Sequence, residues 1–385
     1  MDKNKTSVFS NGLLWFGAGI SIAEILTGML LAPLGFIKGF AAIIIGHLIG
    51  GTVMFLAGLI GGRTGMSAME TVRISFGQKG ALLFAGLNVI QLIGWTAVMV
   101  ASAALAANTI VVIGTSVWSV ILGLLIALWI LLGLKKLGQI NIVVIAALFI
   151  LTIILSVVVF QGNTPQAAGD ISFGGGVELA VAMPLSWLPI ISDYTRTAEN
   201  PGRATAVSCT TYFIASSWMF LIGMGAALLT GQDDIAAIML GAGMGIAGIL
   251  VVLLSTVTTT FLDAFSAGVS GRSIFPQVSE KILALVATVL GVLLAVFAAA
   301  DQFQDFLYLI GSVFAPMTAI LISDYFVLHR DHSSESVNGI NMILWVIGFI
   351  LYRILLNVDT PLGITFPVIV IIMAASTVIH KVLKK

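Results

Sequence analysis

The sequence predicts an all-α protein that crosses a membrane many times. Of its 385 residues, 59% are hydrophobic and only 9% carry a charge. A soluble domain carries about 25% charged residues, so this chain has too few polar side chains to cover a surface that faces water. A lipid bilayer suits such a surface, and long apolar runs indicate that helices cross it.

Twelve apolar runs of about the length that spans a bilayer follow one another along the chain. They lie near 12–35, 39–61, 80–111, 116–134, 139–160, 177–195, 205–230, 243–270, 282–299, 303–326, 340–356 and 363–380. Alternate connections and the two termini hold all but two of the 17 basic residues: Lys3, Lys5, Arg63, Arg73, Lys79, Lys135, Lys136, Arg196, Arg203, Arg272, Lys281, Arg330, Lys381, Lys384 and Lys385. The positive-inside rule therefore predicts a protein of the inner (cytoplasmic) membrane with both termini in the cytoplasm.

The composition also excludes several classes of protein. The formal net charge is zero, which gives no reason to expect nucleic acid as a partner. Cys209 is the only cysteine, and the four histidines show no metal-ligand spacing. No Ser/His/Asp set or phosphate loop is visible, so we expect that the protein is not an enzyme and has no cofactor. Its expected partner is the lipid bilayer, and no obligate protein partner is expected.

The first run carries polar groups at a depth where an ionisable side chain costs about 2.5–3.5 kcal/mol. Gly17 and Gly19 precede Ser21 and Glu24 there. Glycine permits the helix to unwind, and the carbonyls that unwinding frees bind cations. The alternative is a glycine face for helix packing, with Glu24 paired to a neighbour.

The sixth run contains two prolines, Pro184 and Pro189, on either side of Ser186 and Trp187. Proline removes backbone donors, and a broken backbone in a membrane is tolerated only beside protein or a cavity. The alternative is a kinked packing helix. Breaks five helices apart predict the inverted repeat of LeuT-like transporters, with units 1–160 and 161–330 followed by two helices in 331–385.

The eighth run carries Thr256, Thr259 and Thr260 on one helix face, with Asp263 one turn beyond Thr259. Hydroxyl oxygens suit a hard cation. The alternative is that these hydroxyls bond to carbonyls of their own helix, as is common in membranes.

The third run places Asn88, Gln91 and Trp95 on one face. Trp95 lies at mid-depth, away from the interfacial belt that tryptophan usually occupies, and a planar ring stacks well on it. Its alternative role is ordinary core packing.

Four short stretches carry a resemblance to a known family. They are GGRTG at 61–65, RISFG at 73–77, SDYTR at 192–196, and ISDYF at 322–326 after Pro316. Together and in this order they resemble the nucleobase:cation symporter-1 family over essentially the whole chain. Within that family the chain is most similar to the CytX-type branch, which is associated with hydroxymethylpyrimidine, a thiamine precursor.

The resemblance implies a LeuT-like fold and a set of site residues. It implies a sodium ion held by the carbonyls of Gly17 and Ile20 and by the three hydroxyls of the eighth run. It implies substrate contacts at Ser21, Glu24, Trp95 and Asp263, and we add Gln91, Ser186 and Trp187 from the polar faces described above. The family's aromatic in the sixth helix falls at Pro184 here, so Trp187 is the candidate for the second stacking wall.

The expected function is therefore sodium-coupled import of hydroxymethylpyrimidine or a similar pyrimidine ring by alternating access. The alternative is a proton-coupled symporter of cytosine or another purine- or pyrimidine-related ring, with Glu24 or Asp263 as the proton carrier. A passive channel is a third candidate, which accumulation against a gradient would exclude.

Overall fold

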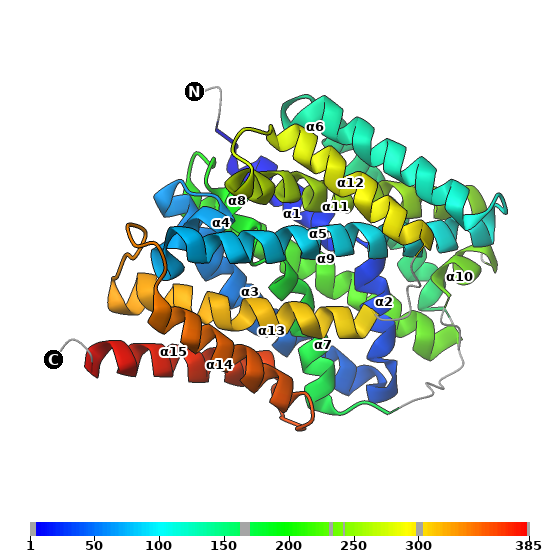
Figure 1. Cartoon of the computed structure of the whole chain (residues 1–385). Helices are drawn as coiled ribbons and strands as arrows, with labels where there is room; N and C mark the ends of the chain where they lie inside the picture. The colour runs from blue at the N-terminus through cyan, green and yellow to red at the C-terminus, as the bar shows by residue number, and fades with distance from the viewer. Residues whose placement is uncertain (1–4, 162–169, 231–233, 242, 298–302, 383–385) are drawn as a thin grey trace.

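Helices make up almost all of the computed structural model, and most of them run side by side (Figure 1). The structure describes residues 5–161, 170–230, 234–241, 243–297 and 303–382, and among these the side chains of all but 133–141, 230, 235 and 241. The elements are α1 (Val8–Gly19), α2 (Ile22–Leu30), η1 (Ala32–Leu34), α3 (Gly35–Thr64), α4 (Ala68–Thr71), α5 (Arg73–Ile110), α6 (Thr115–Val159), α7 (Phe173–Ser186), α8 (Ile191–Thr195), α9 (Pro201–Thr230), α10 (Ile235–Gly241), α11 (Gly245–Ile274), α12 (Glu280–Phe297), α13 (Phe303–Ile322), η2 (Ser323–Leu328), α14 (Gly339–Leu355) and α15 (Thr365–Val382).

The predicted polytopic architecture is confirmed. Nine helical stretches of the described chain are long and apolar enough to cross a membrane, and α7 and α14 are shorter apolar helices. One of the nine, Ile22–Thr64, joins parts of the first two predicted runs, and α6 holds two stretches, Thr115–Leu132 and Ile142–Val159. Outward faces are apolar: α12 exposes Ile282 and Val289. Lipid is the solvent that such faces require.

The first and sixth runs are both broken, as the sequence predicts. The first splits into α1 and α2 at Ile20 and Ser21, and Ser21 caps α2 because its Oγ accepts from the Glu24 amide at 3.3 Å. The sixth splits into α7 and α8 across residues 187–190. Serine is a strong N-cap, which explains why the first run becomes helical again directly after Ser21.

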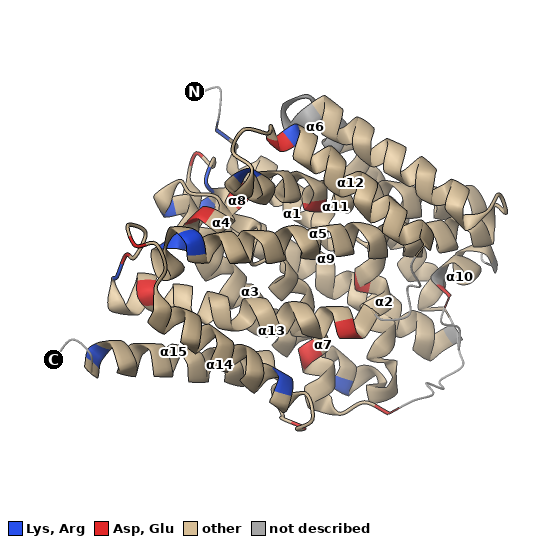
Figure 2. Ribbon diagram, viewed as in Figure 1, with Lys and Arg blue, Asp and Glu red and all other residues tan. Residues whose placement is uncertain are grey.

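One end of the bundle gathers most of the charge. Figure 2 shows most Lys and Arg residues at the end where α1 begins and α15 finishes, while the middle is nearly free of them. Two contacts join connections there that are far apart in sequence. Arg196 pairs with Glu70 across 3.6 Å, and the Thr6 amide donates to the Thr197 carbonyl at 2.9 Å.

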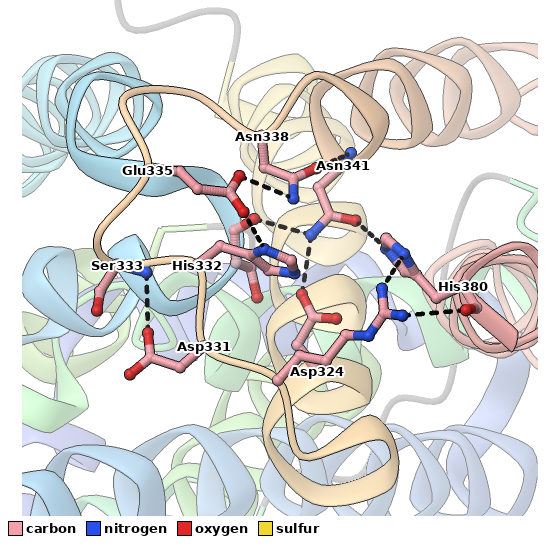
Figure 3. Close-up of polar contacts among 10 residues, drawn as sticks. Asp324, Asp331, His332, Ser333, Glu335, Asn338, Asn341 and His380 are labelled. Carbon is pink, nitrogen blue, oxygen red and sulfur yellow. Dashed lines mark hydrogen bonds and ion pairs between the residues drawn. The ribbon is translucent and has the colours of Figure 1, made fainter. Parts of the chain in front are cut away.

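A polar cluster at that end fastens the last two helices to the rest (Figure 3). Asn341 of α14 donates to Asp324 at 2.9 Å and to the Ser75 carbonyl at 2.8 Å. His380 of α15 donates from Nε2 to Asn341 at 2.8 Å and accepts at Nδ1 from Arg330 at 2.6 Å. The cluster thus links η2, α14, α15 and the start of α5.

At the other end of the bundle, Glu178, a buried glutamate of α7, binds α14 and α15 to the rest of the protein. The carboxylate of Glu178 accepts from Tyr352 Oη at 2.6 Å and from the Thr365 amide at 2.8 Å. Helices α14 and α15 are therefore fixed at both ends, and Glu178 is fully engaged in this role.

Helices α2 and α9 pack closely where they cross, because each has a glycine at the point of contact: Gly28 on α2 and Gly223 on α9. A methyl group on Gly223 would overlap the Ile25 carbonyl oxygen, and one on Gly28 would overlap the Phe220 carbonyl oxygen. These neighbours are backbone atoms, which cannot rotate away as a side chain does. The crossing therefore sets how closely the second half of the first run lies against α9.

We expect Gly223→Ala to destabilise the protein by about 1–3 kcal/mol, the range for overpacking. Thermal unfolding of the purified protein in detergent measures this. Gly86→Ala on α5 is the matched control, because no atom lies within 4 Å of its added methyl group. Equal losses for the two variants would contradict the close crossing of α2 and α9.

Candidate functional site

A small cavity lies between the two broken helices and helices α5 and α11. Its volume is about 10 Å³, enough for one water molecule. It is lined by Ser21, Ala23, Trp95, Met99, Met183, Ser186, Trp187, Thr259 and Asp263. Five residues of the predicted substrate site are therefore together: Ser21, Trp95, Ser186, Trp187 and Asp263.

Two indole rings, those of Trp95 and Trp187, contribute to the lining. Trp95 packs edge-on against Phe303 and Phe306 of α13, with ring centroids 6.0 and 5.5 Å apart. Trp187 packs edge-on against Trp15 of α1 at 5.4 Å and Tyr212 of α9 at 6.2 Å. Within the described residues, neither lining indole N–H has a hydrogen-bond acceptor. Buried indole N–H groups usually have one, so both are free to bind a ligand.

Asp263 is the acidic group of the cavity. Its side chain is buried, and the described part of the chain provides neither an ion-pair partner nor a hydrogen-bond donor for its carboxylate. A carboxylate in such surroundings is costly unless a donor or a proton satisfies it. The cavity thus combines flat apolar walls with one strong acceptor.

The polar face of α5 holds the sixth-helix break in place. Asn88 Nδ2 donates to the Pro189 carbonyl at 3.0 Å and to Ser270 Oγ at 2.9 Å. Gln91 Nε2 donates to the Ser186 carbonyl at 3.0 Å, and its Oε1 is buried with no donor among the described groups. These amides satisfy carbonyls that the break frees, and Gln91 does not line the cavity.

The threonine stripe of α11 faces inward. The hydroxyls of Thr256, Thr259 and Thr260 are buried and find no partner among the described residues. The neighbouring Thr258 differs, because its hydroxyl donates to the Leu254 carbonyl at 2.8 Å. The alternative interpretation was that these three hydroxyls donate hydrogen bonds to carbonyls of their own helix. The structure shows that this is wrong for Thr256, Thr259 and Thr260. Thr259 lies in the same cavity as Ser21, beside the break of the first run.

The break also leaves backbone oxygens that the helix does not fully use. The Gly17 carbonyl accepts one bond, from the Ile20 amide at 3.2 Å, and helices α1 and α11 are in contact. A carbonyl oxygen has a second lone pair. Oxygen donors of this kind suit sodium, a hard cation, better than they suit a transition metal.

Glu24 lies elsewhere. Its carboxylate turns toward α9, where Oε1 accepts from Tyr212 Oη at 2.7 Å and Oε2 contacts Ser216 Oγ at 2.8 Å. It is not among the residues that line the cavity. The rotation of α2 after the break decides which neighbours its side chains meet, and sequence spacing does not give that rotation.

Sequence reasoning missed Met99, Met183 and Ala23 in the lining, and Phe303 and Phe306 behind Trp95. Met99 follows Trp95 by one helical turn, so the spacing that selected Trp95 also points to it. The contribution of α13 has no such signal, because it depends on packing between distant helices.

Comparisons with known proteins agree with this arrangement. The family model for permeases for cytosine/purines, uracil, thiamine and allantoin matches residues 2–337. The cytosine permease of Escherichia coli K12 is 25% identical over 346 residues, covering 87% of this chain and 80% of the permease. A hydantoin permease of Microbacterium maritypicum is 23% identical over 357 residues, covering 84% and 73%.

Solved structures show the same fold at lower identity. Mhp1, a nucleobase-cation-symport-1 transporter in a closed conformation with bromovinylhydantoin bound, matches with a TM-score of 0.82 and 20% identity, covering 98% of this chain and 92% of that one. A Na+-coupled sialic acid symporter matches with a TM-score of 0.73 and 15% identity, covering 98% and 88%. The expected LeuT-like architecture is thereby confirmed. The family match over most of the chain shows that this protein is a membrane transporter, not an enzyme, and that it belongs to the permeases for cytosine/purines, uracil, thiamine and allantoin.

Proposed function

We propose that this permease is a secondary active importer of a small planar pyrimidine, driven by a cation gradient through alternating access. One observation carries the proposal. Two tryptophans with free N–H groups and one carboxylate without a partner converge on a cavity between two broken helices. Flat apolar walls bind an aromatic ring by stacking, and the carboxylate accepts from its exocyclic donors.

Hydroxymethylpyrimidine is the proposed substrate within this class. It offers an amine and a hydroxyl donor to Asp263, and the resemblance to CytX-type transporters supports it as a thiamine precursor for uptake. A site that hydrogen-bonds such groups rejects analogues that lack them.

Sodium is the proposed coupling ion. The carbonyls of Gly17 and Ile20 and the hydroxyls of Thr256, Thr259 and Thr260 supply oxygen donors from the two helices that meet at the first break. Bound sodium would hold α1 against α11 and so favour one conformation of the substrate site. An ion couples transport only when its affinity differs between the two conformations.

The closed cavity implies movement during the cycle. A pyrimidine ring is far larger than the available 10 Å³, so the walls must separate to admit it. Phe303 and Phe306 of α13 lie against Trp95 and are the proposed gate. We propose that units 1–160 and 161–330 form the inverted repeats that rock, with both termini in the cytoplasm and the chain in the inner membrane.

Uptake into proteoliposomes tests this function. Radiolabelled hydroxymethylpyrimidine should accumulate under an inward sodium gradient, and unlabelled pyrimidines should compete. Equilibration without accumulation would indicate a passive channel, and the absence of both uptake and counterflow would refute the proposed substrate class.

A proton-coupled importer of cytosine or a related ring is the second candidate. The similarity to cytosine permease and the presence of two buried carboxylic acids, Glu24 and Asp263, favour it. Accumulation under a proton gradient without any response to a sodium gradient, in the same proteoliposomes, would favour this second candidate.

For the sodium site, we expect Thr260→Val to raise the sodium concentration for half-maximal uptake. The change removes one oxygen donor and keeps the side-chain shape. Thr258→Val is the control, since the Thr258 hydroxyl is satisfied within α11. An unchanged sodium requirement in a transport-competent Thr260→Val protein would count against the site.

For the stacking wall, we expect Trp95→Ala to weaken substrate binding about tenfold or more. Trp95→Phe should retain part of the affinity, because it keeps an aromatic face. Binding of labelled pyrimidine to the purified variants measures both. If the two substitutions have equal effects, stacking on Trp95 is not the source of affinity.

For the acceptor, we expect Asp263→Asn to lower affinity for aminopyrimidines sharply, since half of the amide is a donor that faces the donors of the ring. The sodium dependence of residual uptake should change little. Asp305→Asn, on an exposed part of α13, is the control. Normal affinity in folded Asp263→Asn protein would remove Asp263 from the substrate site.

A further inference from the structure

A second buried polar site lies beside the cavity and joins α2, α3 and α9. Glu24 Oε2 and Ser216 Oγ are 2.8 Å apart, and Ser216 Oγ and His47 Nε2 are 2.6 Å apart. The other ring nitrogen, His47 Nδ1, lies 2.9 Å from the Ile43 carbonyl oxygen. Glu24 and His47 are thus connected through a single hydroxyl, and all three side chains are buried.

Glu24, Ser216 and His47 form a row of hydrogen-bonding groups, and the hydrogens in this row can be counted. A carbonyl oxygen only accepts, so His47 Nδ1 carries a hydrogen and donates to Ile43. The hydroxyl of Ser216 has one hydrogen and two neighbours, Glu24 Oε2 and His47 Nε2. If it donates to Glu24, then Nε2 must donate to it and His47 is an imidazolium. If it donates to His47, then Glu24 must be a carboxylic acid that donates to it.

Both arrangements hold one proton more than an ionised Glu24 beside a neutral His47. In that proton-free form one of the two short contacts would bring two lone pairs together, with no hydrogen between them. The row in this conformation is therefore a proton-loaded, electrically neutral unit. Neutrality also removes the cost of a lone charge at this depth.

Among the described residues, no other group balances a charge on ionised Glu24. Of the ion pairs among the described residues, none includes Glu24. The titratable neighbour on α9 is Tyr212, whose Oη donates to Oε1 at 2.7 Å. Of the carboxylates on α7 and α11, Glu178 is bound to Tyr352 and Thr365, and Asp263 lines the cavity. Phe213 and Phe220 enclose the His47 ring.

We propose that Glu24, Ser216 and His47 form a proton-binding site that is loaded in this conformation and releases its proton during transport, so that a proton moves with the substrate. The proposal rests on the proposed import function. Within the site the proton moves without any other bond changing: Glu24 gives its proton to Ser216 Oγ while Ser216 gives its own to His47 Nε2.

The position of the site explains how it affects the cavity. Glu24 stands in the first turn of α2, three residues after Ser21, which lines the cavity and caps the break. Tyr212, bound to the same carboxylate, packs against Trp187 on the cavity wall. Loss of the proton leaves one of the two short contacts without a hydrogen, either Glu24–Ser216 between α2 and α9 or Ser216–His47 between α9 and α3. The loaded and unloaded forms therefore favour different packing of these three helices beside the break.

Proteoliposomes with a pH-sensitive dye inside test the proposal, with equal sodium on both sides and a clamped voltage. Wild-type protein should accumulate labelled hydroxymethylpyrimidine or cytosine when the exterior is acidified, with influx of protons. At one proton per substrate, a tenfold proton gradient supports up to about a tenfold substrate gradient. Glu24→Gln should keep substrate binding and counterflow but lose this response.

Two serine variants test whether Ser216 transfers the proton or only fills space between the helices. Ser216→Ala removes the shared hydroxyl and should also abolish the response to the proton gradient. Ser217→Ala, at the next buried position of α9, removes a hydroxyl that has no partner among the described residues and should preserve the response. Proton-driven uptake that persists in Glu24→Gln or Ser216→Ala would overturn the proposal.

A measurement without substrate keeps this inference separate from the proposed function. Infrared difference spectra of the purified protein across pH follow the carboxyl and imidazole bands. In the wild type the row should lose its one extra proton in a single step, seen at the carboxyl band if Glu24 holds it and at the imidazole band if His47 holds it. In Ser216→Ala the pH of that step should shift, because the shared hydroxyl no longer joins the two groups. If the wild-type bands stay constant, the proton is permanently held and the site is structural. If the wild type transports substrate under a sodium gradient but shows no proton influx, the proton proposal is overturned. If it transports under neither gradient, the proposed substrate and function are refuted.

Discussion

The structure depends on the need to satisfy an opened backbone inside a membrane. Where α1 gives way to α2, and α7 to α8, the chain leaves the helix at a depth where no water replaces the lost hydrogen bonds. Ser21 satisfies part of the first break, and Asn88 and Gln91 satisfy carbonyls of the second. Helix α5 is therefore fixed against the second break, and this fixes the height at which Trp95 enters the cavity.

The same constraint separates two kinds of buried polar residue. Glu178 and Asn88 bond to other segments and hold them together, and Thr258 is satisfied within its own helix. The indole N–H groups of Trp95 and Trp187 and the stripe hydroxyls of α11 have no such partners within the described residues. In a medium where an unmade hydrogen bond costs about 1–3 kcal/mol, a cluster of unsatisfied groups indicates binding rather than support.

Much of this was predictable because it follows from local sequence. Apolar length gave the spans, proline and glycine gave the breaks, and helical spacing put Thr256, Thr259 and Thr260 on one face. The partners of Glu24 were not predictable in the same way, because Tyr212 and Ser216 lie on α9, 188 and 192 positions further along the chain. Only the rotation of α2 and its close crossing with α9 bring these side chains together.

The aromatic side chains around the cavity have an optical consequence. Three of the seven tryptophans, Trp15, Trp95 and Trp187, gather at or directly behind its walls, in edge-on contact with other rings. Indole emission responds to the polarity and to the quenching groups around the ring. Entry of a ring or of water at this point therefore changes the light that the unlabelled protein emits, so its conformational cycle is open to direct observation by fluorescence.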